Sequence, residues 1–339
     1  MSAATWIPFF WIVTAGSRPI TTWLDSSSVG DPLTLLEGSP VDRLFYQSLI
    51  ALSVAVLFGR RMRVGDVVGS NLLLGGYFLY LLLGTFWSDY SGIALRRWVK
   101  DFGNILVLMV LATEGDPIAA ARTVMVRAAV FVIPANVLLI KYFPEAARHY
   151  DFYTGRVFFT GAALDKNMLG MALVALLGFV GWAFLENMRA PRSRNRTIHQ
   201  GMCLLLIGLA GWVLSIADSA TAVACALTGA ALHLMLMNAF ARRHVVKIGV
   251  FGALAAVTIV ATGLLDEIME LVAASLGRDP SLTGRDAIWR ILLFEDINPL
   301  LGAGSYTFWM PERAARLSEG YMAPINSAHN GFLDVYLDS

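Results

Sequence analysis

The sequence predicts an all-α protein, a bundle of helices that crosses a membrane many times. Of its 339 residues, 57% are hydrophobic and only 15% are charged. Soluble domains are about a quarter charged, so this composition excludes an ordinary cytosolic enzyme and a disordered chain. The formal net charge of +1 offers no general attraction for nucleic acid, and we expect no nucleic-acid partner.

The individual helices are predicted from apolar runs, since a membrane span needs about 20 mostly apolar residues. The runs are continuous rather than alternating, which favours helices over the strands of a barrel. In the fifth run, Pro134 predicts a kink, and Asn136 is expected to face protein rather than lipid. The nine predicted spans are Ala3–Ala15, Leu44–Gly59, Val67–Trp87, Phe102–Thr113, Val124–Tyr142, Met168–Leu185, Met202–Ile216, Ala220–Phe240 and Ile248–Leu265.

Two of these spans, the first and the fourth, are short. The fourth can extend backwards through Trp98 if Lys100 reaches the membrane surface with its ammonium group. We therefore expect residues 1–264 to form the transmembrane bundle. Residues 265–328 are predicted to form one long loop domain with short helices, and residues 329–339 to begin a further span at which the chain is truncated.

The orientation follows from the basic residues between the spans. Alternate loops are short and carry twelve Lys or Arg residues: Arg60, Arg61, Arg63, Arg122, Arg127, Arg189, Arg192, Arg194, Arg196, Arg242, Arg243 and Lys247. Such loops are typical of the cytoplasmic side. The N-terminus is therefore predicted to be cytoplasmic, and the long loop to lie on the outer face.

The long loop contains two candidate site residues, Arg285 and His329. Thr283 and Asp286 have the spacing of a capping box, so a helix is expected to begin there with Arg285 in its first turn. A cation is unfavourable at that end of a helix unless an anion binds beside it. The alternative is that Arg285 forms an ion pair with Asp286 or with a neighbouring carboxylate. His329 precedes another predicted helix over residues 332–337, where it can act as a general base or as a polar residue that only caps the helix.

Further candidates flank the sixth, seventh and eighth spans. Arg156, Lys166 and Asn167 bring two cations and an amide close together in sequence, either as a substrate site or as an anchor for lipid headgroups. Ser219 lies in a polar hairpin between two spans, where turn and capping chemistry is the alternative. The sequence contains no spacing typical of metal ligands, so we expect neither a metal nor another cofactor.

The order of these motifs resembles the O-antigen ligase and polymerase superfamily of bacterial envelope enzymes. The motifs are Thr283-Gly284-Arg285-x-x-x-Trp289, Pro299-Leu300-Leu301-Gly302-x-Gly304 and Ala328-His329-Asn330-x-x-Leu333. The Asp165-Lys166-Asn167-x-Leu169-Gly170 run and the Asp218-Ser219-Ala220-Thr221 hairpin look most like the exopolysaccharide-polymerase branch.

The resemblance implies a GT-C-like, metal-independent, inverting glycosyltransferase in the bacterial inner membrane. Its donor would be an undecaprenyl-pyrophosphate-linked oligosaccharide and its acceptor a glycan hydroxyl, with membrane lipids and a chain-length regulator as further partners. Arg285 and His329 match the family's catalytic loop residues, while Arg156, Lys166, Asn167, Ser219 and Asn330 are the predicted substrate-binding residues. Several ligases have Arg where this chain has Ala220, so Arg156 or Lys166 is expected to supply the second cation.

Three other functions remain as alternatives. An O-antigen ligase that transfers glycan to lipid A core would share the same site residues and differ in its acceptor. A polysaccharide or lipid transporter would require broken helices and charges at the membrane midplane, whereas here the polar groups gather outside the predicted spans. A non-catalytic membrane scaffold is the fourth hypothesis.

Overall fold

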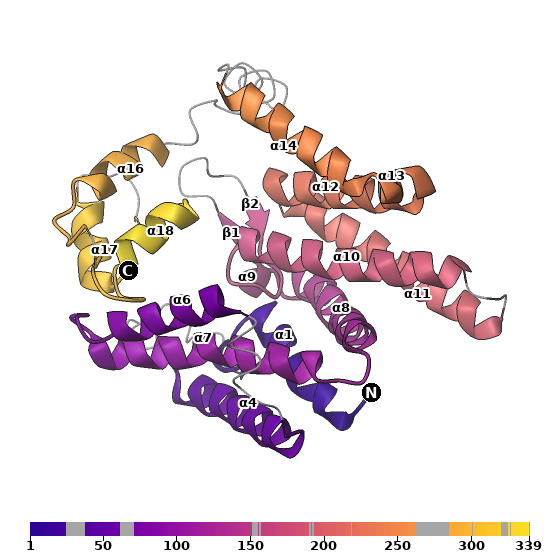
Figure 1. The fold of residues 1–339 in the computed structure, drawn as a ribbon, viewed down its shortest axis with the longest axis horizontal. Coiled ribbons are helices and arrows are strands. Elements are labelled where there is room, and N and C mark those ends of the chain that lie inside the picture. The colour runs from indigo at the N-terminus through magenta and orange to yellow at the C-terminus, as the bar shows by residue number, and fades with distance from the viewer. Residues whose placement is uncertain are drawn as a thin grey trace. The chain divides into compact units, whose positions relative to one another are not determined.

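The computed structural model describes residues 1–24, 38–61, 71–150, 155, 157–189, 191, 193–217, 219–261, 285–299, 301–319, 325 and 327–338. Nearly all of its elements are helices, which confirms the predicted all-α fold (Figure 1). The chain forms two compact units, each described here by itself. Unit 1 comprises Met1–Leu79 and Arg96–Ala231, and unit 2 comprises Tyr80–Leu95 and Leu232–Ser339.

Helices in the described residues follow the predicted runs closely. They are η1 (Ala3–Thr5), α1 (Trp6–Ala15), α2 (Ile20–Leu24), α4 (Pro40–Gly59), α6 (Leu72–Gly84), α7 (Ser91–Ala112), α8 (Pro117–Tyr142), α9 (Pro144–Ala147), α10 (Lys166–Arg189), α11 (Arg194–Ile216), α12 (Ala220–Met237), α13 (Ala239–Arg243), α14 (Val245–Ala261), α16 (Arg285–Leu293), α17 (Pro311–Ser318) and α18 (Gly331–Asp338). Among these, α4, α8, α10 and α11 are long and apolar enough to cross a membrane, and shorter apolar helices accompany them. This is the architecture of a multi-pass membrane protein.

The short fourth run is part of a longer helix. α7 begins at Ser91 and so extends well before Trp98, as the lengthened prediction requires. The ammonium of Lys100 lies 4.5 Å from the ring centroid of Tyr46 on α4, so it has a cation–π partner on a neighbouring helix.

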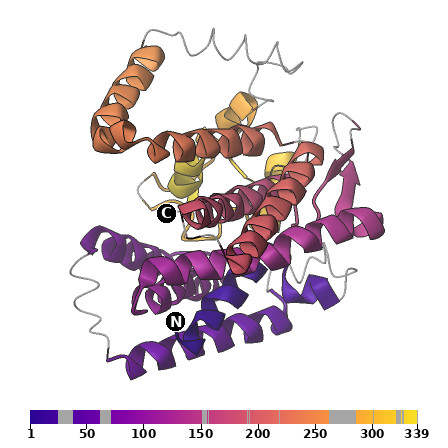
Figure 2. The same cartoon turned by 90° about the vertical axis from the view of Figure 1, so that its right-hand side faces the viewer.

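Unit 1 is organised around α8, which packs against α1, α10 and α11 (Figures 1 and 2). Its core joins aliphatic side chains of these helices, including Val132, Ile133, Leu173 and Val213, all at most 2% exposed. α8 continues through Pro134 to Tyr142.

Asn136 is fully buried, which confirms that it faces protein. Its amide nitrogen donates to the carbonyl of Val132 (2.8 Å), and its Oδ1 accepts from the backbone N–H of Ala162 (2.7 Å).

A short β-hairpin connects α9 to the loop before α10. Strand β1 (Arg148–Tyr150) pairs antiparallel with β2 (Val157–Phe159), with His149 opposite Phe158. The apolar runs predict no helix or strand between Tyr142 and Met168. Aromatic and β-branched residues favour strands, but two strands of three residues are too short to stand out as a periodic pattern.

Unit 2 contains α16, α17 and α18, which surround a small core (Figure 1). Ile288, Leu292, Phe308, Leu317 and Leu337 form this core, and each is at most 8% exposed. Helix α18 lies where the sequence predicted a helix after His329.

The link between α6 and α7 packs against the loop that precedes α17. The indole of Trp87 donates to the carbonyl of Leu301 (2.8 Å), and the hydroxyls of Ser88 and Thr307 are 2.7 Å apart. Gly304 has φ of +93°, and a Cβ there would lie 2.5 Å from the Cα of Ser88. Position 304 therefore needs glycine for its conformation and for close packing.

Candidate functional site

His329 lies at a strained and exposed position just before α18. Its φ of 51° is in the left-handed region, which is uncommon for a residue other than glycine although His is among the enriched types. The backbone N–H of His329 donates to the hydroxyl of Ser327 (3.1 Å). Such strain persists only where the surroundings over-determine it, and it is concentrated at functional sites.

Asn330 forms the N-terminal cap of α18. Its Oδ1 accepts from the backbone N–H groups of Phe332 (3.1 Å) and Leu333 (3.4 Å). These two bonds fix the start of the helix directly after His329. The structure therefore gives Asn330 a capping role, and its predicted role in substrate binding stays a prediction.

A carboxylate on the same helix holds the backbone on the other side of His329. Asp334 Oδ1 accepts from the backbone N–H of Ala328 (3.0 Å) and from the indole of Trp309 (3.0 Å). Hydrogen bonds to a charged acceptor are stronger than neutral ones. Asp334 thus connects three parts of unit 2: the segment before α17, the His329 segment and α18.

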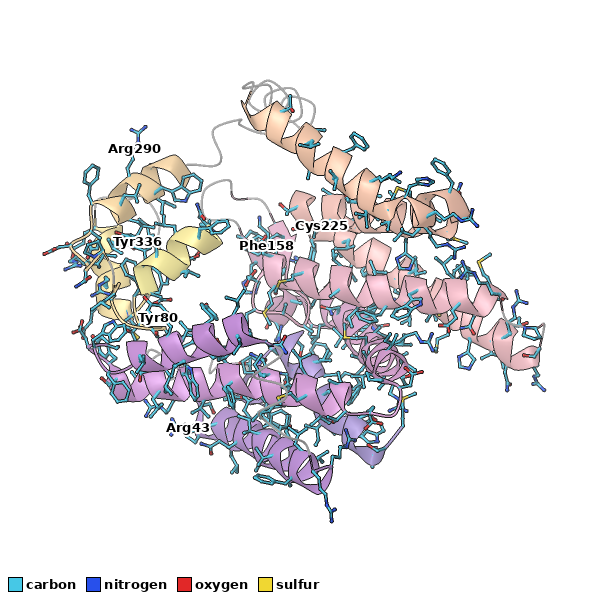
Figure 3. The ribbon with its side chains drawn as sticks, viewed as in Figure 1. Arg43, Tyr80, Phe158, Cys225, Arg290 and Tyr336 are labelled. Atoms are coloured by element: carbon cyan, nitrogen blue, oxygen red, sulfur yellow. The ribbon has the colours of Figure 1, made fainter. Side chains whose placement is uncertain are left out.

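Helix α16 provides a third contact, after Asn330 and Asp334, that holds the backbone beside His329. The indole of Trp289 donates to the carbonyl of Ala328 (2.8 Å), so both polar backbone groups of Ala328 are bonded. The neighbouring Arg290 lies on the exposed side of α16 (Figure 3).

Arg285 is the first residue of α16, and the structure describes its backbone but not its side chain. Positions 285 and 289 are one turn apart on the same face of this helix. The helix start that carries Arg285 is therefore joined to the His329 segment through Trp289. Thr283 of the predicted capping box lies outside the described residues, as does the side chain of Asp286.

A second group of predicted residues belongs to unit 1, at the start of α10. Asp165 caps this helix, because its Oδ1 accepts from the backbone N–H groups of Asn167 (2.8 Å) and Met168 (2.9 Å). The ammonium of Lys166 lies 4.8 Å from the ring centroid of Phe158 on β2, a residue labelled in Figure 3. The side chain of Asn167 is exposed, while Lys166 is half-buried.

Ser219 lies beside this group. It is 7% exposed, and a Cβ at Gly170 would lie 3.4 Å from its Oγ and 2.5 Å from the Cβ of Ala222. The starts of α10 and α12 therefore approach each other closely at Gly170, as small residues allow between membrane helices. Arg156 lies outside the described residues.

Six of the seven predicted site residues belong to the described part of the chain, three in each unit. Lys166, Asn167 and Ser219 are together in unit 1, while Arg285, His329 and Asn330 are together in unit 2. Sequence reasoning missed the contribution of Trp309 and Asp334. The available signal was weak, because an acidic residue in the first turn of a helix is common for reasons of the helix dipole alone.

The site can be described chemically as one imidazole presented to solvent beside a helix N-terminus. Within the described ranges, no group of three or more His, Cys, Asp or Glu side chains could hold a metal ion. In general, an exposed imidazole can transfer a proton, and the free backbone N–H groups at the start of a helix can bind an anion.

Comparison with known proteins supports the predicted resemblance. The sequence model of the family described as O-antigen ligase matches residues 202–339. This stretch includes Ser219, Arg285 and the whole His329 segment. The predicted resemblance to the superfamily is confirmed by this match.

The chain is also 26% identical over 300 residues to the exopolysaccharide production protein ExoQ of Rhizobium meliloti (strain 1021). The alignment covers 84% of this chain and 64% of ExoQ, so the chain spans less than two thirds of the length of that relative. No solved structure matches the chain.

Proposed function

We propose that this protein is a membrane glycosyltransferase that extends a glycan on the outer face of the bacterial inner membrane. The donor is an oligosaccharide on a polyprenyl pyrophosphate, and the acceptor is a hydroxyl group of another glycan. The observation that carries the proposal is the His329 segment. His329 has an exposed imidazole on a strained backbone. Trp289 and Asp334 bond to the backbone of the preceding residue, Ala328, and Trp289 belongs to the helix that begins with Arg285.

The proposed reaction is a single displacement at the anomeric carbon. The acceptor oxygen forms a bond to that carbon while the bond to the pyrophosphate oxygen breaks, and the bonding electrons leave with the pyrophosphate. His329 takes the hydroxyl proton, for which a neutral imidazole is suited near pH 7. Attack from the side opposite the leaving group inverts the anomeric configuration.

Arg285 is proposed to stabilise the negative charge that develops on the leaving pyrophosphate. Free backbone N–H groups at the start of α16 would add to this effect. The resemblance of the sequence motifs, and not a contact in the structure, is the basis for proposing Lys166 or Arg156 as a second cation and Asn167, Ser219 and Asn330 as further substrate-binding residues. No metal takes part in this scheme.

Polymerisation is favoured over ligation by the similarity to ExoQ, whose name refers to exopolysaccharide production. Ligation remains the second candidate, because the matching family is described as O-antigen ligase. The two reactions differ only in their acceptor.

The test is incubation of the purified protein with a lipid-linked oligosaccharide, without nucleotide sugar. Polymerisation predicts longer lipid-linked chains, whereas ligation predicts product only when lipid A core is added. A protein that moves the donor across a vesicle membrane without forming a new glycosidic bond would contradict the proposal and favour a transporter.

A further inference from the structure

Unit 1 contains a cavity of about 490 Å³ that neither the proposed reaction nor the predicted site residues use. It lies where α8 ends at Tyr142, and its lining includes Arg18, Thr22, Glu145, His149 and Leu164. Two helices of membrane-spanning length have a terminus near this cavity: α8 ends there and α10 begins there. It is therefore placed at the level where a span leaves the apolar part of a membrane.

Arg18 is the unusual member of this lining. It is only 6% exposed, and it makes no ion pair with a carboxylate in the described part of the chain. Burial without an opposite charge lowers the pKa of its guanidinium. Because arginine stays protonated in proteins, Arg18 is a buried cation that has no matching anion among the described residues.

Backbone carbonyl groups hold the guanidinium in one orientation. Its Nη2 donates to the carbonyls of Ala146 (3.0 Å) and Gly161 (2.6 Å), and its Nε donates to the carbonyl of Ala162 (3.3 Å). The ring centroid of Trp23 lies 5.6 Å from its Cζ. These contacts leave Nη1, with its two N–H groups, without an acceptor among the described residues.

The turn that supplies two of these carbonyls is itself fixed. Gly161 has φ of +56°, and a Cβ there would lie 2.1 Å from Oδ1 of Asn136. The same oxygen of Asn136 accepts from the backbone N–H of Ala162. The position of Arg18 therefore depends on buried backbone and not on flexible side chains, so the cation is organised before any ligand binds.

His149 adds a second polar group to the cavity. Its imidazole stacks on Phe158 at a centroid distance of 5.9 Å, and it can donate a hydrogen bond in either tautomer. Glu145 is exposed and forms no ion pair with Arg18. Tyr142, Leu164 and the neighbouring apolar residues complete a wall suited to the uncharged part of a ligand.

From this geometry we infer that the cavity at Arg18 and His149 binds a phosphate group, of the kind found in a phospholipid headgroup or in free phosphate. A phosphate oxygen accepts a hydrogen bond from Nη1 of Arg18, and the negative charge of the phosphate offsets the free energy of desolvation of the buried guanidinium. The location at the end of two spans suits a headgroup whose acyl chains lie along α8 and α10. Binding does not depend on glycan transfer and is measured without donor or acceptor.

The experiment uses the full chain in two arms. In a neutral detergent, inorganic phosphate is titrated by calorimetry. In nanodiscs of phosphatidylcholine with a minor share of phosphatidylglycerol, native mass spectrometry counts the phosphatidylglycerol that stays bound. Binding in both arms indicates a general phosphate site, whereas retention of the lipid alone identifies the headgroup as the source.

Leu164→Asp and Leu164→Asn form the matched pair of variants. Leu164 is 47% exposed, so neither change disturbs the core, and the two new side chains differ in charge but hardly in shape. We expect the Asp variant to bind at least about tenfold more weakly than the Asn variant, because only the Asp variant adds a negative charge to the cavity.

Arg18→Gln should also lose binding, whereas Arg148→Gln, a cation beside His149 that does not line the cavity, should retain it. If Arg18→Gln does not fold, the Leu164 pair still decides the question. The inference is overturned if the wild type binds neither probe, or if both Leu164 variants bind as the wild type does.

Discussion

Asp334 is predicted to position His329 for the proposed reaction. Its Oδ1 accepts two hydrogen bonds of 3.0 Å, from Ala328 N–H and from the indole of Trp309. Replacing Asp334 with Ala removes both and leaves the two donors without this acceptor.

The size of the effect follows from these two bonds. A hydrogen bond to a charged group contributes about 1.5 kcal/mol at the low end. The bond from Ala328 therefore stabilises the His329 segment by about 1.5 kcal/mol, and the bond from Trp309 anchors Asp334 by a similar amount. The left-handed backbone at His329 costs about 1 kcal/mol or more. Without Asp334 the remaining contacts hold this strain poorly, and we expect the rate of transfer to fall about 10- to 100-fold.

The assay is the extension of a lipid-linked oligosaccharide, analysed by mass spectrometry at saturating and at limiting donor. A positioning role predicts a lower kcat with little change in KM. Asp334→Asn keeps one acceptor oxygen and should retain intermediate activity. Hydrogen exchange at the Ala328 amide, which needs no activity, should become faster in Asp334→Ala.

Asp338→Ala is the matched control, because Asp338 accepts from the backbone N–H of Phe308 (2.8 Å) at the other end of α18. If both variants lose the same activity, the effect comes from general loosening of α18. Activity of Asp334→Ala within about twofold of wild type, where positioning predicts a loss of about tenfold or more, would refute the reasoning.

The remaining predictions concern three residues and the metal. His329→Gln and His329→Ala should each lower transfer by about 10²–10⁴-fold while donor binding persists, because an amide cannot take the proton; an active Gln variant would leave His329 only an orienting role. Arg285→Lys should be nearly as poor as Arg285→Ala in the same assay, since lysine lacks the planar fork that binds pyrophosphate; wild-type rates in Arg285→Ala would make it a surface residue. Activity should persist in excess EDTA, and its loss on chelation with recovery on adding Mg²⁺ would contradict the metal-free scheme. Burial raises the pKa of Glu114, but bonds from Ser2 and the guanidinium of Arg60 outweigh this and lower the pKa to about 2. Glu114 should therefore stabilise the fold by about 3 kcal/mol above pH 4.5, a contribution lost as the pH falls towards 2; thermal melts should show this loss in the wild type but not in Glu114→Gln.

Sequence alone determined the class of the protein and the position of most helices. Hydrophobic runs are local properties of the chain, and a membrane requires helices wherever such runs occur. For this reason α4, α8, α10 and α11 appear where the apolar pattern placed them. The helix after His329 could also be predicted, because Asn330 is a strong capping residue next to an apolar run.

The candidate site could be predicted only in part from the sequence. Arg285 and His329 were proposed from their motifs and the order of those motifs, whereas Trp289 appeared only as a member of a family motif and had no predicted role. Their connection through Ala328 could not be predicted, since Trp289 and Ala328 are 39 residues apart. The same is true of Asp334, whose partner Trp309 lies 25 residues away.

Only the tertiary structure decided which polar groups form hydrogen bonds with each other and which residues adopt a strained backbone conformation. Arg18 lies in a short polar segment without any motif, and its carbonyl partners are more than 120 residues away. The left-handed backbone of His329 likewise depends on contacts from α16, α18 and the segment before α17. Apolar burial is specified residue by residue, whereas hydrogen bonds across the fold need a defined distance and angle, which the chain acquires only when its helices pack.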